Sequence, residues 1–485
     1  MVFSSVTFLF LFLPIVLVVY YALPFRYRSA WILAASWVFY GWWRIDFLLL
    51  LVLAACVAWY LGGRIARHRI SNPRRARAAL AVGVTVAIGI LGYFKYFNFG
   101  VEALSALLSS IRGRGITAWS VILPIGISFY TFQVISYLVD VYRDDAPPAR
   151  GFVDVAAYVS LFPQLVAGPI VRYREIAGQL LSRDHSWELF SHGALRFMVG
   201  LARKVLIADA VAPVVNAVFA SRAPGLAGAW IGVAAYTVQI YFDFAAYSDM
   251  AVGMGRMLGF RFPENFDAPY HSASITEFWR RWHMTLSRWL RDYLYIPLGG
   301  SRRGGSRTIV NLMTVMALGG LWHGAAWSFF LWGIWHGAWL VGERVLDTPR
   351  PVSATHSATR RATRRATRRA TRRVLTLVVV MVGWVLFRAE SLRAAIALYA
   401  AMAGLRGLPI GETVAWQFGT GSLVALVAGW IIVALEPALV RRLAATGADV
   451  PPVGLAVRLS IYAAFGFSLV RVLAASYSPF LYFQF

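Results

Sequence analysis

Apolar stretches long enough to cross a lipid bilayer recur along almost the whole of this 485-residue chain. A helix needs about 20 consecutive apolar residues to span the hydrocarbon core. The stretches lie at residues 2–22, 30–43, 46–63, 79–98, 121–140, 152–170, 192–220, 228–255, 309–331, 327–342, 374–388, 391–404, 418–436 and 455–475. Because several are too short to span, some must be re-entrant or buried in a bundle. We therefore predict an all-α polytopic membrane protein with roughly 11 to 13 membrane-embedded helices.

The composition agrees with a membrane protein. With 59% hydrophobic and 14% charged residues, the chain has too little polar surface to cover a soluble globule of its size. The net charge of +25 would suggest nucleic-acid binding in a soluble protein, but here the basic residues fall mostly between apolar stretches. We expect the lipid bilayer as a partner and no nucleic acid. The single cysteine, Cys56, excludes an intramolecular disulfide and a CxxC metal site, and no metal is expected.

Arginine-rich loops predict the topology of the chain. The clusters lie within residues 64–77, 280–307 and 357–373 and at Arg441 and Arg442. Basic loops stay in the cytoplasm, so counting spans from these clusters places both termini on the outer face. We expect one integral membrane domain over residues 1–485, with an Arg-rich low-complexity cytoplasmic loop over 344–373. Its repeat, SATRRATRRATRRATRR, is expected at most to touch anionic lipid headgroups, with a substrate-binding role as the minor alternative.

Polar and ionisable residues interrupt two of the apolar stretches. Placing such residues at membrane depth is costly, so they usually face a bundle interior or a watery cavity. The candidates are Asp243, Tyr247 and Asp249 in QIYFDFAAYSDMAVGMG, and Trp322, His323 and His336 in GGLWHGAAWSFFLWGIWHG. The flanking glycines allow close approach of helices or of a ligand, and the tryptophans form stiff aromatic walls. These two stretches therefore predict the lining of a tunnel.

An amphipathic stretch, residues 274–300, lies between them. Ser274 precedes Glu277 by three residues, which is the start of a capping box, and apolar residues then recur at helical spacing. Such a helix lies in the plane of the cytoplasmic interface. Its arginines either extend to lipid headgroups or hold a phosphate-bearing coenzyme. The candidates for the second role are Arg280, Arg281, Arg288 and Arg291, and His283 among them can reach inward.

Histidine is the favoured catalyst because its near-neutral pKa lets it take a proton from a hydroxyl and return it to a leaving group. The chain contains no GxSxG elbow, no P-loop and no HExxH motif, so hydrolase, NTPase and zincin chemistry have no motif support. His323 is the first catalytic candidate and His283 is the second. His323 is thirteen residues from His336, about 220° around an ideal helix, so the two are not expected to act as an adjacent pair.

These residues carry a resemblance to a known family. The chain resembles the membrane-bound O-acyltransferases, most closely their bacterial alginate O-acetyltransferase branch, and the similar stretches run from its first residue to its last. They are MVFSSVTFLFLFLP at the start, LPIGISFYTFQVISYLVDVYR, LFPQLVAGPIVRY, YFDFAAYSDMAVGMGRMLGFRFPENFDAPY, ITEFWRRWHMTLSRWLRDYLYIPLGGSR, GGLWHGAAWSFFLWGIWHG and the final PFLYFQF. The arginine repeat is the departure from the family pattern.

The resemblance implies a ring of tilted helices around a funnel or tunnel, with interfacial and re-entrant helices. His323 matches the signature histidine of the WHG motif, and His283 matches the second polar position, in FWRRWH. The resemblance further implies that acetyl-CoA enters from the cytoplasm as the donor substrate, with no permanently bound cofactor. It implies a location in a bacterial inner membrane, from which the chain would pass acetyl to an extracytoplasmic serine-hydrolase-like (SGNH-type) partner. We expect that partner to work with polysaccharide export machinery to O-acetylate an exopolysaccharide such as alginate.

Several alternatives stay open at this point. Cellulose or peptidoglycan would be served by the same route, because polymer specificity would belong to the partner. In an alternative mechanism, His323 takes the acetyl group itself as a transient acyl-imidazole and does not act as a general base. In other classes, a transporter or flippase would need two internally similar halves, which are not visible by eye. A non-catalytic scaffold would leave the buried histidines replaceable.

Overall fold

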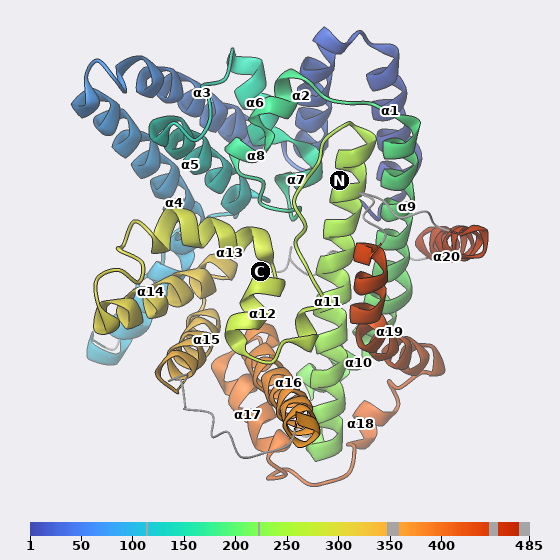
Figure 1. The fold of residues 1–485 in the computed structure, drawn as a ribbon. Helices are drawn as coiled ribbons and strands as arrows, with labels where there is room; N and C mark the ends of the chain where they lie inside the picture. The colour runs from blue at the N-terminus through green and yellow to red at the C-terminus, as the bar shows by residue number, and fades with distance from the viewer. Residues whose placement is uncertain (113–114, 222–223, 347–357, 446–453, 475–485) are drawn as a thin grey trace. The chain divides into compact units, whose positions relative to one another are not determined.

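The described part of the protein is built from helices, with no strand among its residues (Figure 1). The structure is a computed structural model that describes residues 1–112, 115–221, 224–346, 358–445 and 454–474. Six of its helices are long and apolar enough to cross a membrane. These are α3 (Ile45–His68), α4 (Pro73–Arg112), α11 (Gly225–Met257), α16 (Ala358–Arg388), α19 (Thr420–Ala445) and α20 (Leu455–Ala474). The all-α polytopic prediction is confirmed, whereas the helix number and the ring around a funnel stay predictions.

The chain divides into two compact units. Unit 1 comprises Met1–Leu201, Tyr247–Pro263 and Ile461–Phe485, and unit 2 comprises Ala202–Ala246 and Glu264–Ser460. Three helices, α9 (Trp187–Arg203), α11 and α20, have residues in both units. The prediction of a single domain over residues 1–485 stays a prediction.

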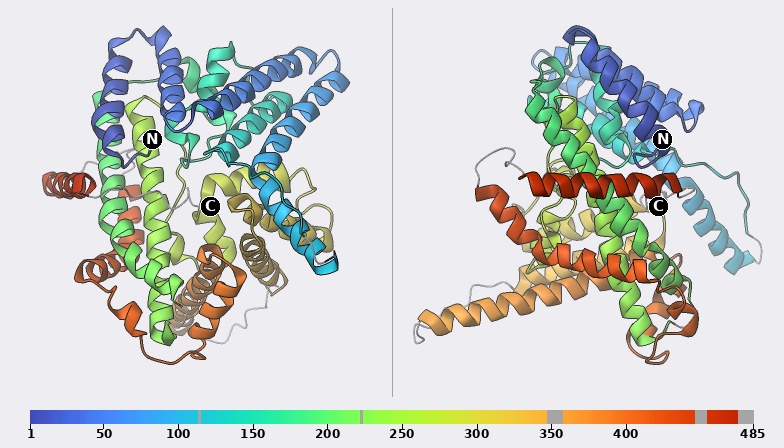
Figure 2. Two further views of the ribbon diagram at one scale, coloured as in Figure 1. Left: turned by 180° about the vertical axis from the view of Figure 1, so that it is seen from behind. Right: turned by 90° about the vertical axis from the view of Figure 1, so that its right-hand side faces the viewer.

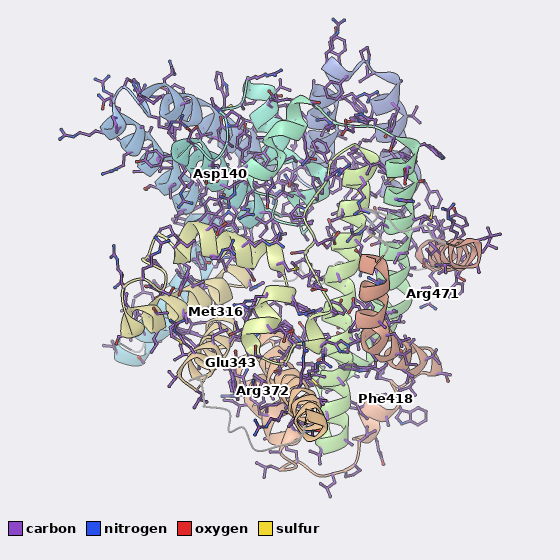
Figure 3. The ribbon with its side chains drawn as sticks, in the orientation of Figure 1. Asp140, Met316, Glu343, Arg372, Phe418 and Arg471 are labelled. Atoms are coloured by element: carbon purple, nitrogen blue, oxygen red, sulfur yellow. The ribbon has the colours of Figure 1, made fainter. Side chains whose placement is uncertain are left out.

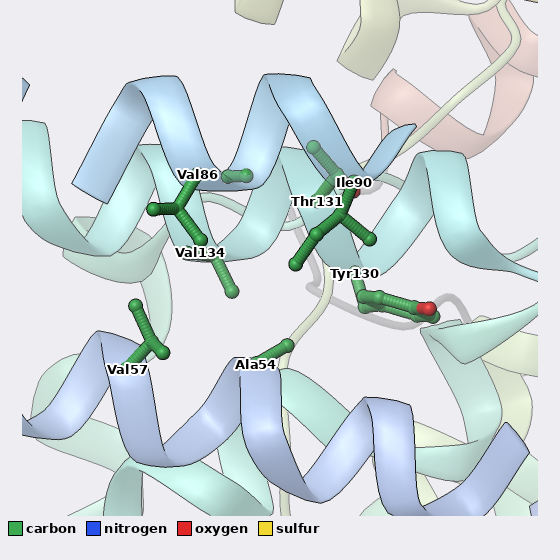
Figure 4. Close-up of a pocket in the computed structure, with 8 residues that line it drawn as sticks. Ala54, Val57, Val86, Ile90, Tyr130, Thr131 and Val134 are labelled. Atoms are coloured by element: carbon green, nitrogen blue, oxygen red, sulfur yellow. The ribbon is translucent and has the colours of Figure 1, made fainter. Parts of the chain in front are cut away.

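Unit 1 is organised around α3, α4 and α5, which pack side by side (Figure 1). Of these, α5 spans Ile127–Arg143. The further helices of this unit include η1 (Phe8–Phe12), α1 (Leu13–Ala22), α2 (Phe25–Gly41), α6 (Phe152–Ser160), α7 (Phe162–Leu165) and α8 (Tyr173–Leu181). A Cβ on Gly62 would lie 2.3 Å from the Tyr137 ring, so glycine is what lets α3 approach α5. A small apolar cavity of about 20 Å³ remains between the three helices, lined by residues such as Val86 and Val134 (Figure 4).

Unit 2 contains the two histidine motifs. Besides α16, α19 and the first part of α11, it contains η2 (Lys204–Ala208), α10 (Asp209–Ala220), η3 (Pro269–His271), α12 (Ile275–Arg281), α13 (Met284–Leu290), η4 (Arg291–Tyr295), α14 (Gly305–His323), α15 (Trp327–Leu346), α17 (Leu392–Met402) and α18 (Glu412–Ala415). The helices α14 and α15 form a tightly packed hairpin. A Cβ on Gly320 would lie 2.2 Å from the Phe329 carbonyl oxygen, and one on Gly333 would lie 2.2 Å from that of Met316. The expectation that glycines allow close approach in this motif is confirmed.

The stretch 274–300 is not the single amphipathic helix that we expected. Ser274 does cap its start, because its Oγ accepts a hydrogen bond from the Glu277 N–H at 3.0 Å. The helix then stops at Arg281, and His283 adopts a left-handed conformation with φ +42° before α13 begins. A non-glycine residue at positive φ interrupts the helical hydrogen-bond ladder. The bend turns the second half of the stretch into a separate helix.

The arginine repeat is also different from the loop that we expected over residues 344–373. Within that range α15 continues to Leu346, residues 347–357 lie outside the described part, and α16 already begins at Ala358. Alanine and arginine are strong helix formers, and the repeat leads directly into the apolar residues that follow Arg373. Residues 358–373 therefore form the first half of a long helix, and this half extends away from α15 and α17 (Figure 2).

Candidate active site

His323 lies in a cluster of aromatic rings inside unit 2. It is the last residue of α14 and is only 5% exposed. The centroid of its ring lies 5.2 Å from that of Trp332 on α15 and 5.2 Å from that of Phe387 on α16. Trp322, the residue before it, contacts the same ring at 4.9 Å. Electrostatic interactions of this imidazole are strong because the surrounding rings exclude water.

His283 belongs to the same aromatic cluster. Its ring centroid is 6.5 Å from that of His323 and 6.2 Å from that of Trp322, and Phe244 on α11 packs edge-on against it at 4.7 Å. The side chain is completely buried. The bend at His283 thus carries the imidazole into the protein interior, toward the end of α14. The two histidines that the sequence singled out are 40 residues apart in the chain (323 minus 283) and lie together in the fold.

Asn265 holds the bend and selects the protonation of His283. The Oδ1 atom of Asn265 accepts from Thr285 Oγ1 at 2.8 Å and from the Thr285 backbone N–H at 3.3 Å. A backbone N–H can only donate, so this amide atom must be the oxygen. The same oxygen lies 3.1 Å from His283 Nδ1, which therefore carries the proton. In the neutral ring, Nε2 is then left as a hydrogen-bond acceptor or base.

The environment of His283 keeps it neutral. Burial lowers the pKa of His283 from 6.5 to about 3, and the residue lies outside the six candidate spans. Its Nε2 is buried and has no hydrogen-bond partner among the described residues. A buried acceptor without a partner is costly in a folded protein, and such atoms often mark the position of a water or a substrate.

His336 is the third histidine of the region and lies beyond Trp332. Its ring lies 5.0 Å from the Trp332 ring, which also contacts His323, and 5.3 Å from Trp279 on α12. His336 is fully buried, and neither ring nitrogen has a hydrogen-bond partner among the described residues. Gly383 on α16 provides room for it, since a Cβ there would lie 3.0 Å from Nε2. His323 and His336 belong to two helices of one hairpin, with Trp332 in contact with both.

The four candidate arginines differ in their surroundings. Arg281 pairs with Asp267 at 3.2 Å and with Glu277 at 3.1 Å, and Arg291 pairs with Asp292 at 2.7 Å. These two side chains already have acidic partners. In the described part of the chain, Arg280 and Arg288 have no acidic partner, and Arg280 is exposed while Arg288 is half-buried. The pair Arg280 and Arg288 is therefore better placed to hold a phosphate.

Asp243 has a partner that the sequence analysis did not identify. The ammonium of Lys204 on η2 lies 2.9 Å from Asp243 Oδ1 and 2.5 Å from Asp209 Oδ1. The side chains of Lys204 and Asp243 are 2% and 4% exposed. Buried charges need such pairing, so this contact explains an aspartate inside α11. The signal in the sequence was a lysine within the apolar stretch 192–220.

Tyr247 and Asp249 have partners within unit 1. The Tyr247 ring stacks on Phe3 with a centroid distance of 4.3 Å, and Asp249 Oδ1 accepts from Arg196 at 2.9 Å. These contacts give both side chains a structural role. A part in lining a tunnel stays a prediction for Asp243, Tyr247 and Asp249.

Comparison with known proteins identifies the family. The family model of the membrane-bound O-acyltransferases matches residues 149–366. The chain is 44% identical to the probable alginate O-acetylase AlgI of Azotobacter vinelandii and 44% identical to that of Pseudomonas putida, over 100% of both chains in each case. It is 33% identical to the peptidoglycan O-acetyltransferase of Helicobacter pylori, over 84% of this chain and 81% of that protein. The chain thus belongs to the membrane-bound O-acyltransferase family and is a multi-pass membrane O-acyltransferase.

Proposed function

We propose that this protein takes acetyl from cytoplasmic acetyl-CoA and passes it across the inner membrane to an extracytoplasmic SGNH-type partner, which O-acetylates an exopolysaccharide such as alginate. The observation that carries this proposal is the pair of buried imidazoles, His323 and His283, with ring centroids 6.5 Å apart in an aromatic cluster. The full-length relatives are named probable alginate O-acetylases, and these names support acetyl as the transferred group and alginate as the polymer.

His323 acts as the general base in this reaction. Its imidazole takes the proton of the acceptor hydroxyl, and the oxygen attacks the thioester carbonyl carbon. The C–O bond forms, the C–S bond breaks, and the thiolate of coenzyme A takes the proton from the imidazolium. Trp332 and Phe387 keep water away from the thioester, which prevents hydrolysis.

His283 and the arginines hold the donor. The bare Nε2 of His283 accepts a hydrogen bond from an amide N–H of the pantetheine arm, which satisfies a buried acceptor. Arg280 and Arg288 bind phosphate oxygens of the coenzyme. His336 contacts Trp332, which lies between it and His323. His336 therefore supports the position of Trp332 and does not act on the reacting atoms.

A second acceptor is favoured by one specific observation. The peptidoglycan O-acetyltransferase of Helicobacter pylori is similar to this chain over most of both proteins. The same acetyl-delivering chemistry therefore suits a peptidoglycan acceptor, with the polymer chosen by the partner.

The test uses the full chain in proteoliposomes with labelled acetyl-CoA on one side. The purified partner and its polymer are on the other side, and label in the polymer is measured for the wild type, His323→Ala and His68→Ala. His68, in the last turn of α3, is the matched histidine control. We expect the control to retain transfer and His323→Ala to lose about 10²-fold or more.

Two outcomes would overturn the proposal. Equal transfer by His323→Ala would exclude the general-base role. Passage of free label without transfer to the polymer, equally in all three proteins, would favour a transporter.

A further inference from the structure

The arginine-rich half of α16 is a surface that the acyl transfer reaction does not explain. Eight arginines occur as pairs every four residues from Arg360 to Arg373, and no acidic residue occurs between Asp347 and Glu390. We propose that this half-helix binds the headgroups of anionic phospholipids and anchors α16 at the membrane surface. The inference is independent of the acceptor and of the role of His323.

The charge pattern requires a counter-anion. Arginines four residues apart lie on neighbouring positions of one helix face, where like charges repel one another. Arg360 and Arg361 also lie in the first turn of α16, where the macrodipole already favours anions over cations, and this turn has no acidic residue. A helix with this pattern is destabilised by its own charges until an external anion compensates them.

The described arginines are positioned to meet that anion. Arg368, Arg369 and Arg372 are exposed, and the buried Nε of Arg373 has no hydrogen-bond partner among the described residues. At 100° per residue, the four side chains fall within about 140° of the helix circumference. The threonines between them bond back to their own helix, as Thr371 does to the Thr367 carbonyl at 3.1 Å. The arginines therefore supply the charge of one face (Figure 3 labels Arg372).

The apolar residues that follow the repeat indicate that the bound anion is a lipid headgroup. The apolar residues of α16 begin at Val374, and they make up most of the candidate span Ala366–Arg388, which has the inner arginines at its start. At 1.5 Å per residue, Arg372 is about 3 Å and Arg368 about 9 Å along the axis from Val374. The headgroup layer is about 5–7 Å thick on each side, so with their long side chains these inner arginines lie at headgroup depth. Arg360 lies about 21 Å away along the axis, beyond the layer.

Binding of headgroups to α16 also affects the aromatic cluster around His323. The same helix carries Trp384 and Phe387, and Phe387 contacts the ring of His323. Phosphate headgroups at the charged end therefore fix one wall of the active site.

The experiment compares two matched charge variants of the full chain in nanodiscs. The inner variant replaces Arg368, Arg369, Arg372 and Arg373 by glutamine, and the outer variant replaces Arg360, Arg361, Arg364 and Arg365 by glutamine. Phosphatidylglycerol retained by each protein, relative to phosphatidylcholine, is measured by native mass spectrometry at low and high salt. Because each arginine contributes about fivefold near an anionic surface, we expect at least a tenfold loss of preference in the inner variant. We expect a loss of less than about threefold in the outer variant, and weaker preference at high salt.

Further controls separate charge from folding. An inner Arg→Lys variant keeps the positive charge and should keep the preference, and thermal unfolding of every variant is measured alongside. Equal retention of the two lipids by the wild type would overturn the proposal, as would equal losses in the inner and outer variants. Displacement of phosphatidylglycerol by soluble acidic oligosaccharide at equimolar amounts would overturn it in favour of a polysaccharide-binding surface.

Discussion

The substitution Gly333→Ala tests whether the hairpin of α14 and α15 sets the geometry of the aromatic cluster around His323. A Cβ at Gly333 would lie 2.2 Å from the backbone oxygen of Met316, whereas ordinary contacts begin at 3.4 Å. The helices must separate to remove an overlap of 1.2 Å (3.4 minus 2.2), because a backbone oxygen cannot rotate away. Overpacking of this kind costs about 1–3 kcal/mol, and the helix propensity of alanine returns at most about 1 kcal/mol. We expect a net loss of roughly 1–2 kcal/mol.

The substitution Gly333→Ala should also lower activity, because Trp332 is the adjacent residue in the chain. Trp332 precedes Gly333, and the centroid of its ring lies 5.2 Å from that of His323. Separating the two helices therefore moves the Trp332 ring relative to His323. We expect acetyl transfer to fall by at least tenfold, because small misplacements of reacting groups are costly.

Gly342→Ala is the matched control for this substitution. Gly342 lies on the same helix, and a Cβ there would meet nothing within 4 Å. Gly342→Ala should leave activity unchanged and raise the unfolding temperature slightly. Both variants are compared with the wild type by thermal unfolding in detergent and by acetyl transfer. If Gly333→Ala behaves like Gly342→Ala in both assays, the close packing of α14 and α15 does not determine how Trp332 lies against His323.

Three further predictions concern buried polar groups. Lys204→Met leaves Asp243 without its ammonium and should destabilise the protein by about 3–5 kcal/mol, whereas the double variant with Asp243→Asn should recover part of the loss in thermal unfolding. Glu343 on α15 accepts hydrogen bonds from the backbone N–H and the hydroxyl of Thr276 on α12, at 2.9 and 2.7 Å (Figure 3 labels Glu343). Glu343→Gln should therefore weaken the attachment of α12 and lower the free energy of unfolding by about 1–2 kcal/mol, which thermal unfolding measures. Because burial lowers the folded-state pKa of His283 to about 3, the unfolded chain binds the extra proton below pH 6.5. Stability should therefore fall by about 2 kcal/mol between pH 6.5 and pH 5, and an unchanged pH profile in His283→Gln would contradict this.

The parts of the protein that depend on local sequence patterns were predictable. Long apolar stretches predicted the spanning helices, and glycines in the WHG stretch predicted the close hairpin that Gly320 and Gly333 form. The Ser274 cap was also predictable, because a capping box is a local arrangement. His323 and His283 were both identified, since ionisable groups in apolar surroundings are rarely tolerated without a reason.

Features that depend on tertiary contacts were not predictable. The helical periodicity of residues 274–300 gave no sign of the bend at His283, which is held by Asn265, a residue 18 positions earlier. Phe387 was not identified, because an aromatic residue in an apolar helix has the same pattern whether it faces lipid or His323. Lys204 was overlooked, although a lysine within an apolar stretch requires a partner. Residues 344–373 were expected to be a loop because the repeat was judged by its low complexity and not by the helix propensity of its residues.

The acetyl content of secreted exopolysaccharide tests the central claim most directly. The measurement uses cells in which this chain is the only membrane acetyltransferase, with wild type and His323→Ala at equal abundance in the membrane, and ester groups are counted by nuclear magnetic resonance. If His323 is the general base, the wild type yields an acetylated polymer and His323→Ala yields a polymer without acetyl groups. Equal acetyl content in the two polymers would contradict catalysis by His323.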